Sequence, residues 1–282
     1  MTADARAQEA VSAAGATIPS LGFGTFELDR REATDAVATA LEVGYRHVDT
    51  AQIYGNEAEV GGAIADSDIA REHIWLTTKV WPENFAPPEF RPSVEKSLDR
   101  LGVDYVDLLL LHWPNDDVPL AETIEQLNDV RREGLAHQIG VSNFPSALLA
   151  EAAALSDAPL ATNQVEYHPF LSQSAVLSEA RNRGMALTAY SPLARGEVFE
   201  DATLGDIGEA HGKHAGQVAL RWLIQQDGVI AIPRSADPDH IASNFEIFDF
   251  ELTDAEVERI TGLTAAHRRL IDPKGLAPDW DR

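Results

Sequence analysis

The sequence predicts an α/β protein with a closed (β/α)8 barrel, the TIM-barrel class. Short apolar runs rich in β-branched residues alternate along the 282-residue chain with longer amphipathic segments. Most of the short runs are hydrophobic throughout, which is typical of parallel strands that are buried on both faces. Eight such strand–helix units of roughly 30–40 residues fit a closed barrel better than an open doubly wound sheet.

The predicted strands and helices alternate along the whole chain. In residues 30–43, for example, four apolar residues share one helical face. Two additions to the barrel are expected, a β-hairpin at 10–18 and a capped helix at 252–262. The predicted strands are 18–24, 45–49, 74–79, 105–111, 136–142, 161–167, 186–191 and 228–233. The predicted helices lie near 30–43, 56–66, 91–101, 119–133, 145–155, 172–183, 203–226 and 237–244.

We read residues 1–282 as one domain, because no linker rich in Pro, Gly or Ser and no low-complexity segment divides them. The chain contains no cysteine, which excludes disulfides, thiolate catalysis and cysteine-ligated zinc. No run approaches the ~20 apolar residues that span a bilayer, and the N-terminus has no apolar signal segment. We therefore expect a cytoplasmic protein, and we expect it to act as a monomer.

The charge balance is strongly acidic, with 46 Asp and Glu against 22 Lys and Arg and a net charge of −24. This charge argues against binding to nucleic acids or anionic membranes, since both require a positive surface. The acidic residues are spread along the predicted helices, and only four residues are lysines. The composition favours a halophilic protein, because salt screens the repulsion among the acids. A cationic partner is the alternative.

Ionisable residues stand at the ends of three consecutive predicted strands. Asp49 ends the second strand, and Tyr54 lies in the loop that follows. Lys79 ends the third strand, and His112 follows the fourth. Taken singly, these could be a capping aspartate, a surface lysine and a core histidine. Together they lie at the carboxyl-terminal rim, where barrel enzymes place their catalytic groups.

This set of residues suits proton transfer to a carbonyl oxygen. A free phenol has a pKa of ~10 and is a poor acid at neutral pH. A nearby ammonium group should lower the pKa of Tyr54, and a carboxylate should hold that ammonium in place. Such a phenol can protonate the oxygen of a carbonyl while hydride reaches its carbon.

Seven motifs resemble those of the aldo-keto reductase family, in the family's order and spacing. They are "GFGTF" (22–26), "DTAQIYGNEAEVG" (49–61), "LLLLHWP" (108–114), "IGVSNF" (139–144), "NQVEYHP" (163–169), "YSPLARG" (190–196) and "IPRSADPDHIASN" (232–244). The pattern is most similar to the bacterial-type branch that includes 2,5-diketo-D-gluconate reductases. The resemblance implies a (β/α)8 barrel that reduces aldehydes and ketones with NAD(P)H and uses Tyr54 as general acid. The implied catalytic tetrad is Asp49, Tyr54, Lys79 and His112.

The resemblance also implies that NAD(P)H lies across the carboxyl-terminal rim. Ser142, Asn143 and Gln164 match the family residues that bind the nicotinamide carboxamide. Tyr190 matches the aromatic residue that stacks under the nicotinamide ring. The implied cofactor residues are Gly24, Thr25, Asp49, Ser142, Asn143, Gln164, Tyr190, Ser191, Pro192, Leu193, Ile232, Pro233, Arg234, Ser235, His240 and Asn244. The expected substrate pocket comprises Phe26, Tyr54, Trp81, His112 and Trp113, with Phe85 as a further candidate.

The resemblance implies that NADPH is the preferred cofactor, with NADH weaker. Arg234 replaces the lysine that contacts the 2′-phosphate in the family, and Ser235 is retained. His240 replaces a family arginine, and Ser243 replaces a glutamate that often contacts adenine. Because an imidazole carries less charge than a guanidinium at neutral pH, we expect a smaller NADPH preference than a two-arginine site would give.

Two other functions remain open. One is a non-catalytic, NADP-binding barrel, such as a channel-associated subunit or a structural protein, although the intact tetrad argues against it. The other is a lyase or isomerase that uses Lys79 as a Schiff-base nucleophile. We expect no metal site, because the "HGKH" stretch (211–214) near Glu209 lacks a suitable ligand set. His168 is expected to be structural.

Overall fold

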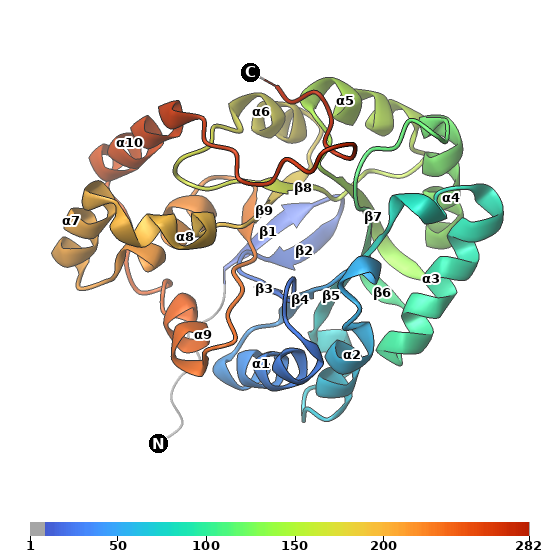
Figure 1. Ribbon diagram of the computed structural model, residues 1–282, viewed down its shortest axis with the longest axis horizontal. Coiled ribbons are helices and arrows are strands. Elements are labelled where there is room, and N and C mark those ends of the chain that lie inside the picture. Colours follow the sequence, from blue (N-terminus) through green and yellow to red (C-terminus); the bar gives the residue numbers. More distant parts are fainter. Residues whose placement is uncertain (1–8, 282) are drawn as a thin grey trace.

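The computed structural model describes residues 9–281 and confirms the predicted (β/α)8 barrel (Figure 1). Every strand of the ring is parallel to its neighbours. The ring closes where Leu21 forms a parallel bridge with Ala231, whose carbonyl accepts a 2.8 Å hydrogen bond from the Gly22 N–H. In order around the barrel, the strands are β3 Phe23–Gly24, β4 His47–Asp49, β5 Trp75–Val80, β6 Val106–Leu111, β7 Ala136–Ser142, β8 Thr162–Glu166, β9 Ala186–Tyr190 and β10 Val229–Ala231.

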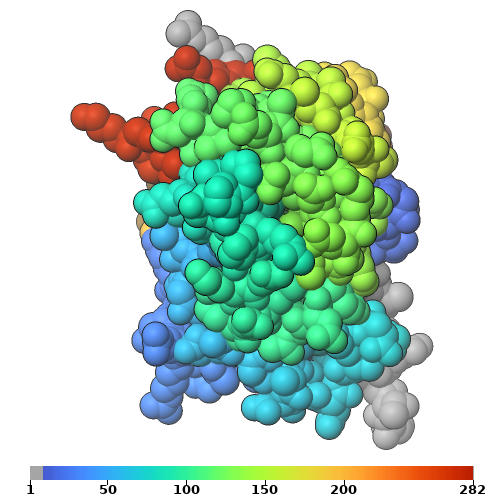
Figure 2. Space-filling model, turned by 90° about the vertical axis from the view of Figure 1, so that its right-hand side faces the viewer, coloured from blue at the N-terminus to red at the C-terminus, as the bar shows by residue number. Residues whose placement is uncertain are grey.

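Helices surround the ring and bury their apolar faces on it. Figure 2 shows one side of the molecule, where α3, α4 and α5 form a continuous cover. Asp29 and Glu32 form a capping box that fixes the start of the first helix. The helices are α1 Arg30–Val43, α2 Glu57–Ala65, α3 Pro87–Leu101, α4 Leu120–Arg132, α5 Ser146–Leu155, α6 Ser174–Asn182, α7 Ala202–His211, α8 Ala215–Ile224, α9 Pro238–Phe245 and α10 Asp254–Leu263. The last of these is the predicted extra C-terminal helix.

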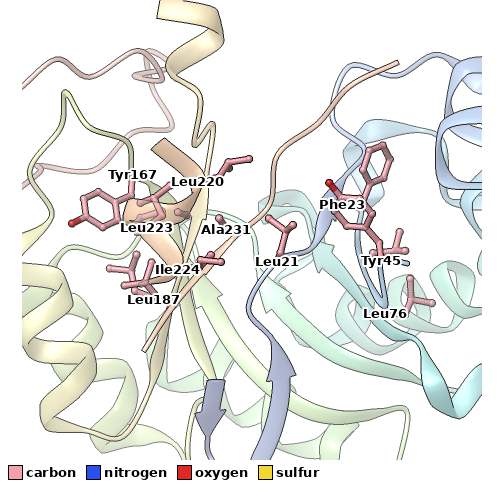
Figure 3. Close-up of a cluster of buried hydrophobic side chains, with 14 of the residues drawn as sticks. Leu21, Phe23, Tyr45, Leu76, Tyr167, Leu187, Leu220, Leu223, Ile224 and Ala231 are labelled. Atoms are coloured by element: carbon pink, nitrogen blue, oxygen red, sulfur yellow. The ribbon is translucent and has the colours of Figure 1, made fainter. Parts of the chain in front are cut away.

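The buried core lies between the strands and the helices. Figure 3 shows Leu21 and Ala231 where the ring closes, with Leu187 and side chains of α8 on one side of them. On the other side, the rings of Phe23 and Tyr45 meet edge to face with centroids 5.8 Å apart. None of the helices described in residues 9–281 is both long and apolar enough to cross a membrane.

The predicted N-terminal hairpin is present as β1 Ala10–Ala13 and β2 Ala16–Pro19. Its buried side chains Ala13 and Ile18 cluster with Leu108 and Ile230 from the inside of the ring. The hairpin therefore closes the amino-terminal end of the barrel, and the opposite end is left for the functional site.

Two predicted boundaries are wrong. The predicted strand 18–24 is divided, because Ile18 and Pro19 pair in the hairpin and the chain joins the ring only from Ser20 onward. The predicted helix 203–226 is two helices. Gly212 adopts a left-handed φ of 66° and ends α7, and the side chain of His214 caps the start of α8.

The acidic surface leads to a prediction about stability. Arg132 illustrates the imbalance, since one guanidinium pairs with both Glu125 and Asp129. We expect the melting temperature to rise by several degrees as KCl is raised from millimolar to molar concentration. Most of the rise should come below about 0.15 M, where the Debye length falls from about 30 Å to about 8 Å. A flat or falling melting curve would contradict the halophilic interpretation.

Candidate active site

A cavity of about 870 Å³ opens at the carboxyl-terminal ends of the strands. The residues predicted to bind cofactor or substrate all line it, apart from the additional candidate Phe85. Asp49, Tyr54 and His112 of the predicted tetrad also line the cavity. Lys79 does not, because its side chain is fully buried next to Asp49. The fold thus brings together residues that are spread over more than 200 positions of the sequence.

Lys79 links the other groups near the end of β4. Its Nζ donates to Asp49 Oδ1 at 2.5 Å, to the Thr50 carbonyl at 2.9 Å and to Tyr54 Oη at 3.3 Å. The second oxygen of Asp49 accepts a 2.7 Å hydrogen bond from Gln164 Nε2. The charge of the buried Lys79 ammonium is therefore balanced by the Asp49 carboxylate, and its three N–H groups have the partners Asp49, Thr50 and Tyr54.

The pKa of Tyr54 is shifted in the direction opposite to our expectation. Burial raises it well above the usual value for a phenol, and the negative charge of Asp49 raises it further. Burial also lowers the pKa of Lys79, while Asp49 opposes that shift. Tyr54 therefore keeps its proton across the neutral range. The pairing of Lys79 with Asp49 explains why the ammonium does not dominate, since the carboxylate offsets its field.

His112 lines the cavity next to Tyr54. Its ring meets the ring of Tyr54 edge to face, with centroids 5.6 Å apart, and lies 5.3 Å from that of Trp81. Burial and the charge of Lys79 hold the pKa of His112 well below its usual value, so the imidazole is neutral. Its Nδ1 is buried without a hydrogen-bond partner. We place the proton on Nε2, because an unpaired N–H would be costly to bury.

The remaining residues of the "DTAQIYGNE" stretch hold the Tyr54 loop. The Asn56 amide donates to the carbonyl of Thr25 at 2.9 Å and ties this loop to the one after β3. The fully buried Glu57 accepts from the hydroxyl of Thr78 at 2.6 Å and pairs with Arg100. Both residues therefore have structural tasks in positioning the phenol.

Gln52 connects the same loop to Trp81, which lines the cavity. Its Oε1 accepts a 3.0 Å hydrogen bond from the Trp81 N–H and a 3.1 Å bond from the Asn84 amide. Its Nε2 donates to the hydroxyls of Ser93 and Ser97. Gln52 was not predicted as a site residue, and it does not line the cavity itself but supports Trp81, which does.

Polar residues at the carboxyl-terminal ends of β7, β8 and β9 form an ordered network. The hydroxyl of Tyr190 donates to Asn143 Oδ1 at 2.8 Å, and Asn143 Nδ2 donates to the His112 carbonyl at 2.9 Å. Ser142 Oγ donates to the Gln164 carbonyl at 2.7 Å. Asn143 has a left-handed φ of 65°, a strained conformation that the network maintains. These groups are therefore fixed before any ligand arrives.

Arg234 lies after β10, at the edge of the cavity. Its Nε donates to the carbonyl of Phe26 at 2.9 Å, and its Nη2 pairs with the Glu27 carboxylate at 3.2 Å. Asp237 caps the start of α9 by accepting from the N–H groups of Asp239 and His240. The guanidinium of Arg234 and the imidazole of His240 line the same cavity.

Residues 20–265 match the model of the aldo/keto reductase family. The chain belongs to this family. As an aldo/keto reductase, it is an oxidoreductase that reduces carbonyl groups with a nicotinamide cofactor. Neither alternative function is favoured by this result. The contacts of Lys79 do not favour a Schiff base either, since its Nζ already donates to three oxygen atoms.

Similar aldo/keto reductases come from the bacterial branch that the motifs indicated. Methylglyoxal reductase DkgB of Escherichia coli O157:H7 is 41% identical over 267 residues, which cover 94% of this chain and 99% of the relative. An aldo-keto reductase of Mycobacterium sp. (strain MCS) is 43% identical over 92% of each chain. A crystal structure provisionally named 2,5-diketo-D-gluconic acid reductase B is 52% identical over 99% of both chains, with a TM-score of 0.97.

The C-terminal segment of this aldo/keto reductase completes the cavity. Ile271, Pro273 and Leu276 line it, and Figure 1 shows the segment crossing the carboxyl-terminal end of the barrel. The fully buried carboxylate of Glu166 holds the segment by accepting from the N–H groups of Leu270 and Ile271, at 2.7 and 2.9 Å. No motif in the sequence marked these residues.

Other lining residues were missed although motifs pointed near them. Glu27 directly follows "GFGTF" and Arg195 lies within "YSPLARG", yet neither was predicted. Phe199 also lines the cavity, with 54% of its surface exposed. The available signal was a charged residue, Glu27, next to a motif that resembles one of the family. Its partners Arg195 and Arg234 are distant in the sequence, so only the fold reveals the pairing.

Phe85 and the histidines of the sequence lie outside the cavity, apart from His112, His214 and His240. The prediction that Phe85 lines the pocket is wrong, because this residue is buried against Phe90 with ring centroids 6.3 Å apart. His211 pairs with Glu256 at 3.0 Å, and His214 caps α8. Within residues 9–281, no group of three or more potential His, Cys, Asp or Glu ligands is close enough to hold a metal ion. His168 is buried beside Glu166.

Proposed function

We propose that this aldo/keto reductase prefers NADPH, reduces uncharged aldehydes and ketones, and uses Tyr54 as its general acid. The observation that carries the proposal is the contact of Lys79 with both Asp49 and Tyr54 at the floor of an apolar-walled cavity. The expectations of a monomer and a cytoplasmic location remain predictions.

The residues that line the cavity fit a nicotinamide cofactor. Asn143 and Gln164 present amide groups, and the ring of Tyr190 is fixed by its hydrogen bond to Asn143. Gly24 brings bare backbone close to the residues after β10, since a Cβ there would lie 3.1 Å from the Ile232 carbonyl oxygen. Ser142 and these residues would hold the carboxamide end, and Arg234 with His240 would contact the 2′-phosphate. When bound, the reduced cofactor supplies hydride to the carbonyl carbon.

Tyr54 completes the reaction by giving its proton to the carbonyl oxygen. As the carbon is reduced, the oxygen becomes an alkoxide, which is a much stronger base than a phenolate. Tyr54 stays protonated until that charge develops, because its pKa is raised. The Lys79 ammonium, held by Asp49, then stabilises the phenolate that remains.

His112 positions the carbonyl for this transfer. A neutral imidazole with its proton on Nε2 can donate a hydrogen bond to the oxygen without adding a second acid. Trp81 and Phe26 flank the pair, since their rings contact those of His112 and Tyr54. These apolar walls exclude water and so strengthen the hydrogen bonds inside.

The lining favours uncharged substrates. Among residues 9–281, no lysine lines the cavity, and the two arginines that do, Arg195 and Arg234, are both paired with Glu27. A substrate carboxylate would find no free partner among these groups and would lose hydration on entry. Of the two substrate names carried by the relatives, methylglyoxal is uncharged and diketogluconate is an anion. The structure therefore supports the former class.

The test compares 4-carboxybenzaldehyde with methyl 4-formylbenzoate, which carry similar aldehyde groups but differ in charge. At low salt, we expect kcat/KM to be about tenfold or more higher for the ester, the equivalent of roughly 1.4 kcal/mol. With the ester, kcat/KM should be higher for NADPH than for NADH. A preference for the acid would overturn the proposed substrate class, and a preference for NADH would overturn the phosphate role of Arg234.

A further inference from the structure

Glu27 forms an ion-pair bridge at the edge of the cavity. It lies in the loop after β3, and its two carboxylate oxygens accept hydrogen bonds from Arg195 Nη2 at 3.2 and 3.1 Å. The same carboxylate pairs with Arg234 Nη2 at 3.2 Å. The two arginines come from the loops after β9 and β10, so one carboxylate joins three loops of the rim.

The Glu27 carboxylate is the anion that pairs with the guanidinium groups of both Arg195 and Arg234. Arg234 is held near Glu27 independently of the carboxylate, because its Nε donates to the Phe26 carbonyl at 2.9 Å. All three side chains line the cavity and are 39–49% exposed, so a ligand can reach them from the cavity. Two convergent guanidiniums are a good receptor for a phosphate group.

We propose that Glu27 is a cofactor-selectivity residue that competes with the 2′-phosphate of NADPH for Arg195 and Arg234. This inference rests on the proposed phosphate role of Arg234. A phosphate monoester carries about −1.5 to −2 charge at pH 7. It cannot share the two guanidiniums with a carboxylate without strong repulsion. NADPH must therefore displace Glu27, whereas NADH lacks the phosphate and leaves the bridge intact. Glu27 thus weakens the binding of NADPH relative to that of NADH.

The experiment measures binding of NADP⁺ and NAD⁺ by titration calorimetry, without any substrate or turnover. Glu27→Gln keeps the size of the side chain and removes its charge. At 50 mM KCl we expect the Kd of NADP⁺ to fall about threefold to tenfold and the Kd of NAD⁺ to change by less than about twofold. In 1 M KCl the gain should largely disappear, because the Debye length is then about 3 Å.

Glu42→Gln is the matched control. Glu42 is an exposed residue of α1 outside the cavity lining, and its replacement removes the same charge. It should leave the ratio of the two Kd values unchanged. Thermal melting of both variants checks that each is folded.

Further outcomes separate this inference from the proposed function. If Glu27→Gln weakens NADP⁺ and NAD⁺ equally, the carboxylate acts only by holding the loops, and the inference is overturned. No change in either Kd overturns it as well. Arg234→Met should weaken NADP⁺ selectively. If that variant leaves selectivity unchanged, the phosphate role of Arg234 fails, whereas success with Arg234→Met and failure with Glu27→Gln rejects only the role of Glu27.

Discussion

Replacing Tyr54 with phenylalanine should lower kcat for carbonyl reduction by about 10²–10⁴-fold and leave NADP⁺ binding almost unchanged. The substitution removes the proposed proton donor but keeps the ring, which packs on Phe26 and His112. Lys79 loses only its weakest contact, the 3.3 Å hydrogen bond, and stays paired with Asp49. Steady-state kinetics together with calorimetry separates the loss of chemistry from a loss of binding.

Tyr167→Phe is the control for this prediction. The Tyr167 hydroxyl donates to Gln226 at 2.8 Å, outside the cavity, so its removal costs a structural hydrogen bond and no proton transfer. Its kcat should stay close to that of the wild type. If Tyr54→Phe also retained near-normal turnover, Tyr54 would not be the acid.

The pH profile of the wild type provides a second check on the acid. A group with a raised pKa keeps its proton up to that higher value, so kcat for reduction should not fall as the pH approaches about 10. The pKa of His112 is lowered, so this residue stays neutral through the neutral range and should cause no loss of rate there. A steep fall between pH 7 and pH 9 would contradict both assignments.

Gly61→Ala should destabilise the fold by about 3 kcal/mol or more. Gly61 is buried in α2, where a Cβ would lie 2.6 Å from Leu101 Cα and closer still to the Leu101 carbonyl. These atoms belong to the backbone at the end of α3, so no side-chain rotation can make room. The two helices must separate, and that would disturb the loop that carries Tyr54. Urea unfolding measures the loss.

Gly62, the next residue, provides a control substitution that should change stability in the opposite direction. Gly62 is exposed in the same helix, and a Cβ there would meet nothing within 4 Å. Gly62→Ala should therefore stabilise the protein by about 0.5–1 kcal/mol, because alanine loses less backbone entropy in a helix. If Gly61→Ala and Gly62→Ala changed the free energy of unfolding equally, the contact with α3 would not be what excludes a side chain at Gly61.

The sequence predicted the barrel well because its signals are local. Apolar runs, caps and motifs such as "DTAQIYGNE" each lie within a short window, and a closed ring places their ends on one rim. The boundary errors arose where the apolar pattern continued through a break. Gly212 interrupts the helix predicted at 203–226, although hydrophobic residues recur on both sides of it.

Other features depended on contacts that no local pattern reveals. The raised pKa of Tyr54 follows from burial and from Asp49, and the sequence shows neither the depth of the site nor the balance of charges. The bridge from Glu27 to Arg195 and Arg234 joins residues separated by more than 160 positions. Such partners are defined only when the strands close into a ring.

The attachment of the C-terminal segment has a consequence for the evolution of this enzyme. Glu166 holds the segment through the main-chain N–H groups of residues 270 and 271, and every amino acid except proline provides that group. The side chains of Ile271 and Leu276 can therefore change without loss of this anchor. The segment can be exchanged to suit new carbonyl compounds, while the barrel, Tyr54 and the residues proposed to bind the cofactor stay as they are.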